Sequence, residues 1–180
     1  MKRSLMAVAA LAICAAPPAF AALPVGATAP NFTAQASMGG KQFPFTLDAA
    51  LKKGPVVLYF FPAAFTKGCT IEAHDFAAAE PQYHALGATL IGVTAGNINR
   101  LTEFSVSECR SKFAVAADPH AKIAKEYKST LAIFPGYSDR TSYVIAPDGK
   151  ILLVYSNLNP DQHVEQTLEA LKAWRSKHPA

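Results

Sequence analysis

Continuous apolar segments in the middle of the chain predict buried β-strands. Residues 55–61 (PVVLYFF) are mostly β-branched and aromatic, show no polar alternation and are too few for a helix. Residues 88–93 form a second apolar segment, and residues 113–116 form a shorter third one. We expect the first two or three of these segments to be parallel strands inside a sheet.

Turn residues and a proline place the remaining strands. Residues 142–146 and 150–155 flank the turn at 147–149 (PDG) and predict an antiparallel hairpin. Residues 43–47 predict a short edge strand, because Pro44 has no N–H to donate within a central strand.

Helix-forming residues separate and follow these strands, between start and stop signals such as Asn, Pro and Gly. The predicted helices are residues 70–86, about 97–112, 118–127 and 160–177. The order of strands, helices and hairpin predicts an α/β fold in which helices flank a central mixed β-sheet.

The N-terminal segment has the features of an export signal. A basic start (KR) is followed by the uncharged apolar run 5–16 and by small residues around a large one at 19–21 (AFA). We expect cleavage after Ala21, which makes residues 1–21 a signal peptide and 22–180 the mature domain. The alternative is an uncleaved anchor, for which the run is short. Cleavage predicts a periplasmic or secreted protein without membrane attachment.

Composition and charge exclude several classes of protein. The chain has 180 residues, of which 51% are hydrophobic and 17% charged, and this suits one folded domain. The formal net charge of +4 falls to +2 when Lys2 and Arg3 leave with the signal, and no basic stripe remains for nucleic acid. The five histidines show no metal-ligand spacing. We expect neither a metal nor an organic cofactor.

The cysteines carry the candidate chemistry. Removal of the signal leaves Cys69 and Cys109, a pair that can be oxidised together in an exported protein. Cys69 lies where a predicted strand leads into a predicted helix, and the free N–H groups of a helix start favour a thiolate. Thr66 can direct a hydroxyl at whatever Cys69 attacks, and Pro62 can wall one side of a pocket.

Several segments together resemble one protein family. Residues 62–69 (PAAFTKGC) resemble the active-site motif of peroxiredoxins, Pro-x-x-x-Thr-x-x-Cys, and residues 68–72 (GCTIE) resemble the bacterioferritin-comigratory or Q-type subfamily. Residues 118–127 and 140–151 are similar to further stretches of that subfamily, including its Arg-x-(Thr/Ser)-(Phe/Tyr)-Val-Ile strand. The resemblance covers residues 23–174.

This resemblance implies a thioredoxin-like fold and a thiol peroxidase acting on hydrogen peroxide or organic hydroperoxides. It makes Cys69 the peroxidatic cysteine, with Pro62, Thr66 and Arg140 as its pocket. Negative charge moves along the sulfur–oxygen–oxygen axis during attack, so a fixed guanidinium such as that of Arg140 stabilises the transition state. The product is a sulfenic acid.

The resolving cysteine departs from the pattern of many members of the subfamily, which place it five residues after the peroxidatic one. That position is His74 here, and Cys109 lies in the segment where other members carry it, on the next helix. Because bridged cysteines need Cα atoms within about 7 Å, we expect partial unfolding around Cys69 and Cys109 on oxidation. The resemblance also implies a thiol reductant of thioredoxin-like type and a monomer.

Two other functions stay open. A thioredoxin-like disulfide oxidoreductase needs Cys-x-x-Cys, but Thr66 and Glu72 occupy the positions three before and three after Cys69. A non-catalytic domain with a structural Cys69–Cys109 disulfide predicts a permanently oxidised pair. Glu72 is either a residue favoured by the helix dipole or a functional group.

Overall fold

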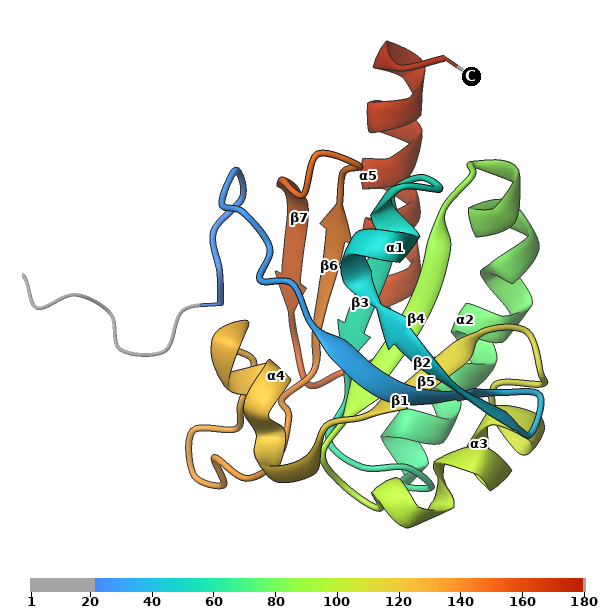
Figure 1. The fold of residues 1–180 in the computed structure, drawn as a ribbon, viewed down its shortest axis with the longest axis vertical. Helices are drawn as coiled ribbons and strands as arrows, with labels where there is room; N and C mark the ends of the chain where they lie inside the picture. Colours follow the sequence, from blue (N-terminus) through green and yellow to red (C-terminus); the bar gives the residue numbers. More distant parts are fainter. Residues whose placement is uncertain (1–21, 180) are drawn as a thin grey trace, which may run out of the picture.

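A computed structural model of the chain describes residues 22–179 and shows a seven-stranded mixed sheet with helices on both faces (Figure 1). The spatial order is β2-β1-β5-β4-β3-β6-β7. The strands are β1 Thr33–Met38, β2 Lys41–Thr46, β3 Val56–Phe60, β4 Thr89–Thr94, β5 Ala114–Ala117, β6 Thr141–Ile145 and β7 Ile151–Ser156. The α-helices are α1 Leu47–Leu51, α2 Lys67–Ala85, α3 Leu101–Ser107, α4 Lys122–Glu126 and α5 His163–Lys177, with 3₁₀ turns at Ile98–Arg100 and Pro119–Ala121.

The pairing of the strands confirms the predicted mixed sheet. β3, β4 and β5 are parallel neighbours, whereas β6 is antiparallel to both β3 and β7. β3 lies between β4 and β6, and all of its residues are buried. The continuous apolar composition of this strand therefore reflects its central position, with both faces covered.

Alternate residues of β3 face two different apolar layers. Leu58 and Phe60 pack in the layer that contains α1 and α4. Val57 and Tyr59 pack in the opposite layer with α2, α3 and α5, the layer that also holds Cys69. α2 and α5 contact each other on this second face (Figure 1).

The sequence interpretation missed the first strand of the sheet. β1 pairs antiparallel with both β2 and β5 and so joins the N-terminal hairpin to the centre. Its buried residues include Ala34 and Ala36, whose small side chains give a weak hydrophobic signal among polar neighbours. β2 is an edge strand, as predicted, and its Pro44 is tolerated there.

The helix predicted to carry Cys109 is shorter than expected. α3 ends at Ser107, and Arg110 and Ser111 have left-handed backbone angles, φ 50° and 56°, which cannot continue a helix. Cys109 therefore lies in a turn that follows α3, and its expected place on a helix was wrong.

Two further boundaries differ from the prediction. The segment 118–127 contains only one short α-helix, because His120 and Ala121 have left-handed backbone angles and interrupt it. The last helix begins at His163 rather than at Pro160.

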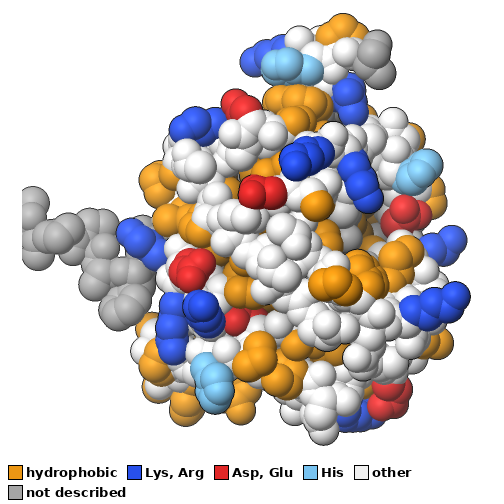
Figure 2. All heavy atoms as spheres, in the orientation of Figure 1, with side chains coloured by type: hydrophobic (Ala, Val, Ile, Leu, Met, Phe, Trp, Pro, Cys, Tyr) orange, Lys and Arg blue, Asp and Glu red, His pale blue; other side chains and the backbone are white. Residues whose placement is uncertain are grey.

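The export signal predicted for residues 1–21 lies outside the described residues. Within residues 22–179, no helix is both long and apolar enough to cross a bilayer. In the same part of the chain, no group of three or more His, Cys, Asp or Glu side chains is placed to hold a metal ion. On the face shown in Figure 2, Lys and Arg side chains are scattered among acidic and apolar ones.

Candidate active site

The first turn of α2 holds Cys69. The helix begins at Lys67, earlier than the predicted residue 70, so Cys69 is its third residue, and only 1% of the side chain is exposed. The first turn of a helix presents backbone N–H groups without partners inside the helix, and α2 is 19 residues long. These groups place partial positive charge beside the sulfur. Cys69 thus lies at the strand-to-helix junction that the sequence predicted.

Arg140, the residue before β6, brings a guanidinium to this sulfur. Its Nη2 donates to Cys69 Sγ at 3.5 Å, its Nε donates to the Leu158 carbonyl at 2.8 Å, and its Nη1 pairs with Glu72. A Cβ atom on Gly68 would lie 3.1 Å from Nη2, so a glycine at this position leaves room for the guanidinium. Arg140 is buried and fixed in three directions.

Glu72 lies one turn after Cys69 on the same face of α2 and is fully buried. Burial raises the pKa of Glu72 to about 8, although the Arg140 cation opposes that rise. Its Oε1 is buried without a hydrogen-bond partner. The sequence left the role of Glu72 open, and the structure brings it into contact with the arginine that contacts Cys69.

The sequence interpretation missed His163, which it grouped with histidines that lack ligand spacing. The side chain is fully buried at the start of α5. Its Nδ1 lies 2.8 Å from Ser142 Oγ and 3.7 Å from Glu72 Oε1. One sequence signal could have identified its burial: His163 precedes Thr167 by four residues and Leu171 by eight. This spacing places all three on one buried face of a helix.

The loop between β3 and α2 places Pro62 and Thr66. Pro62 is half-buried, and its carbonyl accepts a hydrogen bond from Thr94 Oγ1 at 3.1 Å. The Thr66 hydroxyl donates to the Ala63 carbonyl at 3.1 Å. In this conformation the Thr66 hydroxyl is therefore engaged with the loop backbone.

Cys109 is fully buried in the turn after α3. Burial raises the pKa of the Cys109 thiol, and the neighbouring Glu108 adds to that rise. Glu108 also pairs with His74 on α2 across 2.9 Å. Cys69 and Cys109 are both free and belong to the same apolar layer.

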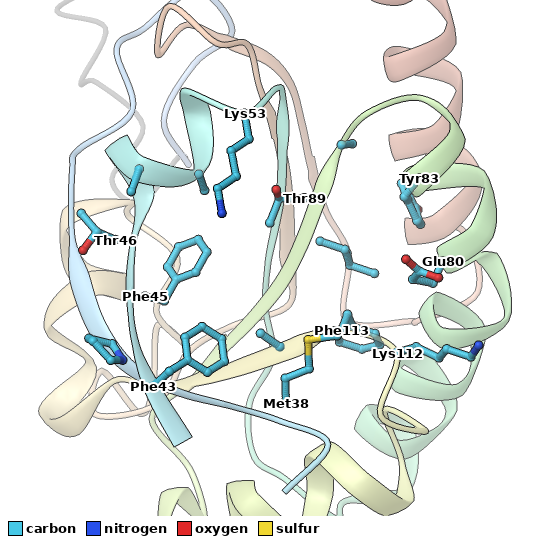
Figure 3. Close-up of a pocket in the computed structure, with 16 residues that line it drawn as sticks. Met38, Phe43, Phe45, Thr46, Lys53, Glu80, Tyr83, Thr89, Lys112 and Phe113 are labelled. Carbon is cyan, nitrogen blue, oxygen red and sulfur yellow. The ribbon is translucent and has the colours of Figure 1, made fainter. Parts of the chain in front are cut away.

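A cavity of about 360 Å³ lies elsewhere, between β2, α1, the start of β4 and the second half of α2 (Figure 3). Phe43, Phe45 and Met38 are among the residues that line it. Neither Cys69 nor Arg140 lines this cavity. The candidate active site is instead a buried cluster of charged and polar groups around Cys69.

A cysteine in the first turn of a helix, contacted by an arginine just before a strand of a mixed sheet, is the arrangement expected of a thiol-dependent enzyme with a thioredoxin-like fold. Residues 25–154 match the AhpC/TSA family. The chain belongs to this peroxiredoxin family and is a thiol peroxidase.

Individual relatives agree with this assignment. The chain is 30% identical to the chloroplastic peroxiredoxin Q of Sedum lineare over 86% of this chain and 81% of that protein. It is 31% identical to the chloroplastic peroxiredoxin Q of Populus jackii over 86% of this chain and 70% of that protein. The crystal structure of peroxidoxin BcpB from Mycobacterium tuberculosis superposes with a TM-score of 0.74 at 28% identity, over 83% of this chain and 96% of that chain. The predicted thioredoxin-like fold is thereby confirmed.

Proposed function

We propose that Cys69 is the peroxidatic cysteine and reduces hydrogen peroxide or organic hydroperoxides. The observation that carries this proposal is the contact between Arg140 Nη2 and Cys69 Sγ inside the first turn of α2. The thiolate attacks the terminal oxygen of ROOH, the S–O bond forms and the O–O bond breaks. Sulfur is oxidised to a sulfenic acid, and the leaving RO⁻ takes one proton and departs as ROH.

The residues around Cys69 have separate roles in this step. The guanidinium of Arg140 is held by Glu72 and the Leu158 carbonyl, so it needs no reorganisation when charge moves toward the leaving oxygen. Pro62 forms one wall of the approach to the sulfur. Thr66 assists when its hydroxyl turns from the Ala63 carbonyl toward the peroxide.

We further propose that Cys109 resolves the sulfenic acid. Its sulfur attacks Cys69 Sγ, a disulfide forms and water leaves, with the thiol proton completing the water. The burial of Cys109 disfavours its thiolate in the closed structure. Because both cysteines are buried, resolution requires opening of the turn after α3 together with the first turn of α2. A thioredoxin-like dithiol then reduces the disulfide by exchange.

The exported, monomeric state is also a proposal. The basic, apolar and small-residue pattern of residues 1–21 supports removal of a signal peptide and a periplasmic or secreted domain of residues 22–180. The mass of the protein recovered from the exported fraction tests this point: an N-terminus at Ala22 supports cleavage, and a retained Met1 contradicts it. Gel filtration of the mature protein tests the monomer.

The proposal is tested by counting thiols in the reduced mature protein before and after one equivalent of hydrogen peroxide. We expect rapid loss of both thiols in the parent, no rapid loss in Cys69→Ser, and a trappable sulfenic acid in Cys109→Ser. Rapid loss of Cys69 alone in the parent indicates a one-cysteine peroxidase. No rapid reaction contradicts the assignment of Cys69 and favours a structural disulfide.

A further inference from the structure

A buried acid beside the active site has one oxygen without a partner. Glu72 uses Oε2 to pair with Arg140, while Oε1 is buried without a hydrogen bond. His163 Nδ1 lies 3.7 Å from Oε1, beyond hydrogen-bond distance. A buried carboxylate oxygen without a hydrogen-bond donor costs free energy, and this cost disfavours the ionised form of Glu72.

The contacts of His163 fix which of its nitrogens carries hydrogen. Nε2 lies 2.9 Å from the Asn157 carbonyl, which can only accept, so Nε2 is the protonated nitrogen. Burial lowers the pKa of His163 to about 4, with the Asn157 contact opposing, and the ring is neutral at pH 7. Nδ1 is therefore an acceptor: it accepts a hydrogen bond from the Ser142 hydroxyl at 2.8 Å and has no hydrogen to donate to Glu72 Oε1, 3.7 Å away.

The charges of Cys69, Glu72 and Arg140 do not sum to zero when the Cys69 thiol and the Glu72 carboxyl are both ionised. Arg140 supplies one positive charge, whereas a Cys69 thiolate and a Glu72 carboxylate supply two negative charges. The titratable and charged groups that face this pair are Cys69 and Asp75 on α2, Tyr59 on β3, Arg140 before β6 and Tyr155 on β7. Arg140 is the sole cation in that set. A proton on Glu72 Oε1 restores neutrality and removes the cost of a buried carboxylate oxygen that has no donor.

We propose that Glu72, facing His163, holds one proton while Cys69 is a thiolate and gives it up when Cys69 becomes a neutral sulfenic acid. This inference rests on the proposed role of Cys69. The reduced cluster carries S⁻, guanidinium and COOH, and the oxidised cluster carries SOH, guanidinium and COO⁻, so its charge stays constant. The proton lost by Glu72 balances the proton gained by RO⁻. His163 is a positioning residue that favours the protonated acid, because its neutral Nδ1 has no hydrogen to donate to a carboxylate oxygen.

Infrared difference spectroscopy tests this directly in Cys109→Ser, which stops at the sulfenic acid. Addition of one equivalent of peroxide at pH 7 should remove the carbonyl-stretch band of a protonated carboxyl. The band should be absent from the double variant Cys109→Ser/Glu72→Gln. It should be retained in Cys109→Ser/Glu80→Gln, which changes a half-buried acid of the same helix. His163→Asn, whose amide can donate to Oε1, should ionise Glu72 and remove the band before peroxide is added.

Proton uptake from a weakly buffered solution provides a measurement that needs no change at Glu72 or His163. With Cys109→Ser alone, the proposal predicts that oxidation takes up almost no proton, because Glu72 supplies it. Uptake of one proton per sulfenic acid overturns the proposal, and so does a carboxyl band that survives oxidation. Failure of the proposed function differs from both outcomes, because no sulfenic acid is trapped at Cys69.

Discussion

Cys69 and Cys109 are equally buried and share one apolar layer, but their immediate surroundings differ. Cys69 lies at the N-terminal end of a 19-residue helix and receives a hydrogen bond from Arg140. Cys109 lies in a turn after the 7-residue α3, beside the acidic Glu108. We therefore expect burial alone to leave a thiol unreactive, and we expect the cation and the helix terminus at Cys69 to make the difference between the two sites.

The largest effect is expected from removing that cation. Arg140→Met should lower the second-order rate constant for peroxide by about 10²–10³-fold, the usual cost of losing one preorganised donor. Arg140→Lys should retain part of the rate constant of the parent. Lysine supplies the positive charge but lacks the planar guanidinium that contacts Glu72 and Cys69 together. Stopped-flow measurement of single-turnover oxidation gives these constants.

Arg110→Met provides the matched control, because this arginine is exposed in the turn after α3. It should leave the rate constant within about twofold of the parent, the range expected for an exposed charge. Equal losses in Arg110→Met and Arg140→Met would mean that general electrostatic attraction, and not the contact with Cys69, sets the rate.

A second prediction concerns stability and distinguishes the Cys69 cluster from the surroundings of Cys109. The folded pKa of Glu72 is raised from 4.5 to about 8, so its contribution to stability is complete below pH 4.5 and is lost as pH rises toward 8. In Glu72→Gln, which has no carboxyl group at this position, this loss of stability with rising pH should be absent. The free energy of unfolding of the parent should therefore fall relative to that of Glu72→Gln between pH 6.5 and 8.

Urea unfolding of both proteins at pH 6.5 and pH 8 measures this relative fall. Proton linkage predicts that it amounts to about 1–2 kcal/mol over the interval. The interval avoids the opposite effect of His163, whose lowered pKa makes stability rise between about pH 4 and 6.5. A difference that stays constant with pH would contradict the raised pKa of Glu72. Glu80→Gln serves as the reference for an acid outside the cluster.

The smallest effect is expected at Cys109. The pair His74–Glu108 joins α2 to the residue that follows α3, at the turn that the proposed resolution requires to open. His74→Ala breaks this pair, and Glu108→Gln also removes the negative charge beside Cys109. Both variants should form the disulfide faster, His74→Ala by about twofold and Glu108→Gln by about fivefold. These factors correspond to less than about 1 kcal/mol, the usual worth of a partly exposed ion pair.

The first oxidation of Cys69 should stay unchanged in both variants. Slower or equal disulfide formation in Glu108→Gln would show that opening of this turn does not limit resolution. The two steps are separated by following peroxide loss and disulfide formation in the same reaction.

The sequence predicted those parts of the fold that depend on local composition. The apolar run of β3 and the proline-marked edge strand β2 were found because their side chains report burial or an edge directly. β1 was missed because the buried Ala34 and Ala36 are small. The end of α3 was missed because left-handed angles at Arg110 and Ser111, two non-glycine residues, leave no compositional mark.

The candidate site was predicted only where a motif spans it. Pro62, Thr66, Cys69 and Arg140 follow from the resemblance to peroxiredoxins, and the structure brings Arg140 to Cys69. The contact of Glu72 with His163 joins two helices that are far apart in sequence, and no local pattern encodes it. A helix face can show that His163 is buried, but only the packing of α2 against α5 shows what it faces.

The comparison between the two cysteines is tested most directly by a residue-resolved time course. The reduced protein is mixed with one equivalent of hydrogen peroxide, quenched with an alkylating reagent at increasing times and mapped by peptide mass. We predict that Cys69 loses its thiol first and that Cys109 follows at the rate at which a Cys69–Cys109 disulfide peptide appears. Loss of Cys109 before Cys69, or oxidation of both without that disulfide, would contradict the account.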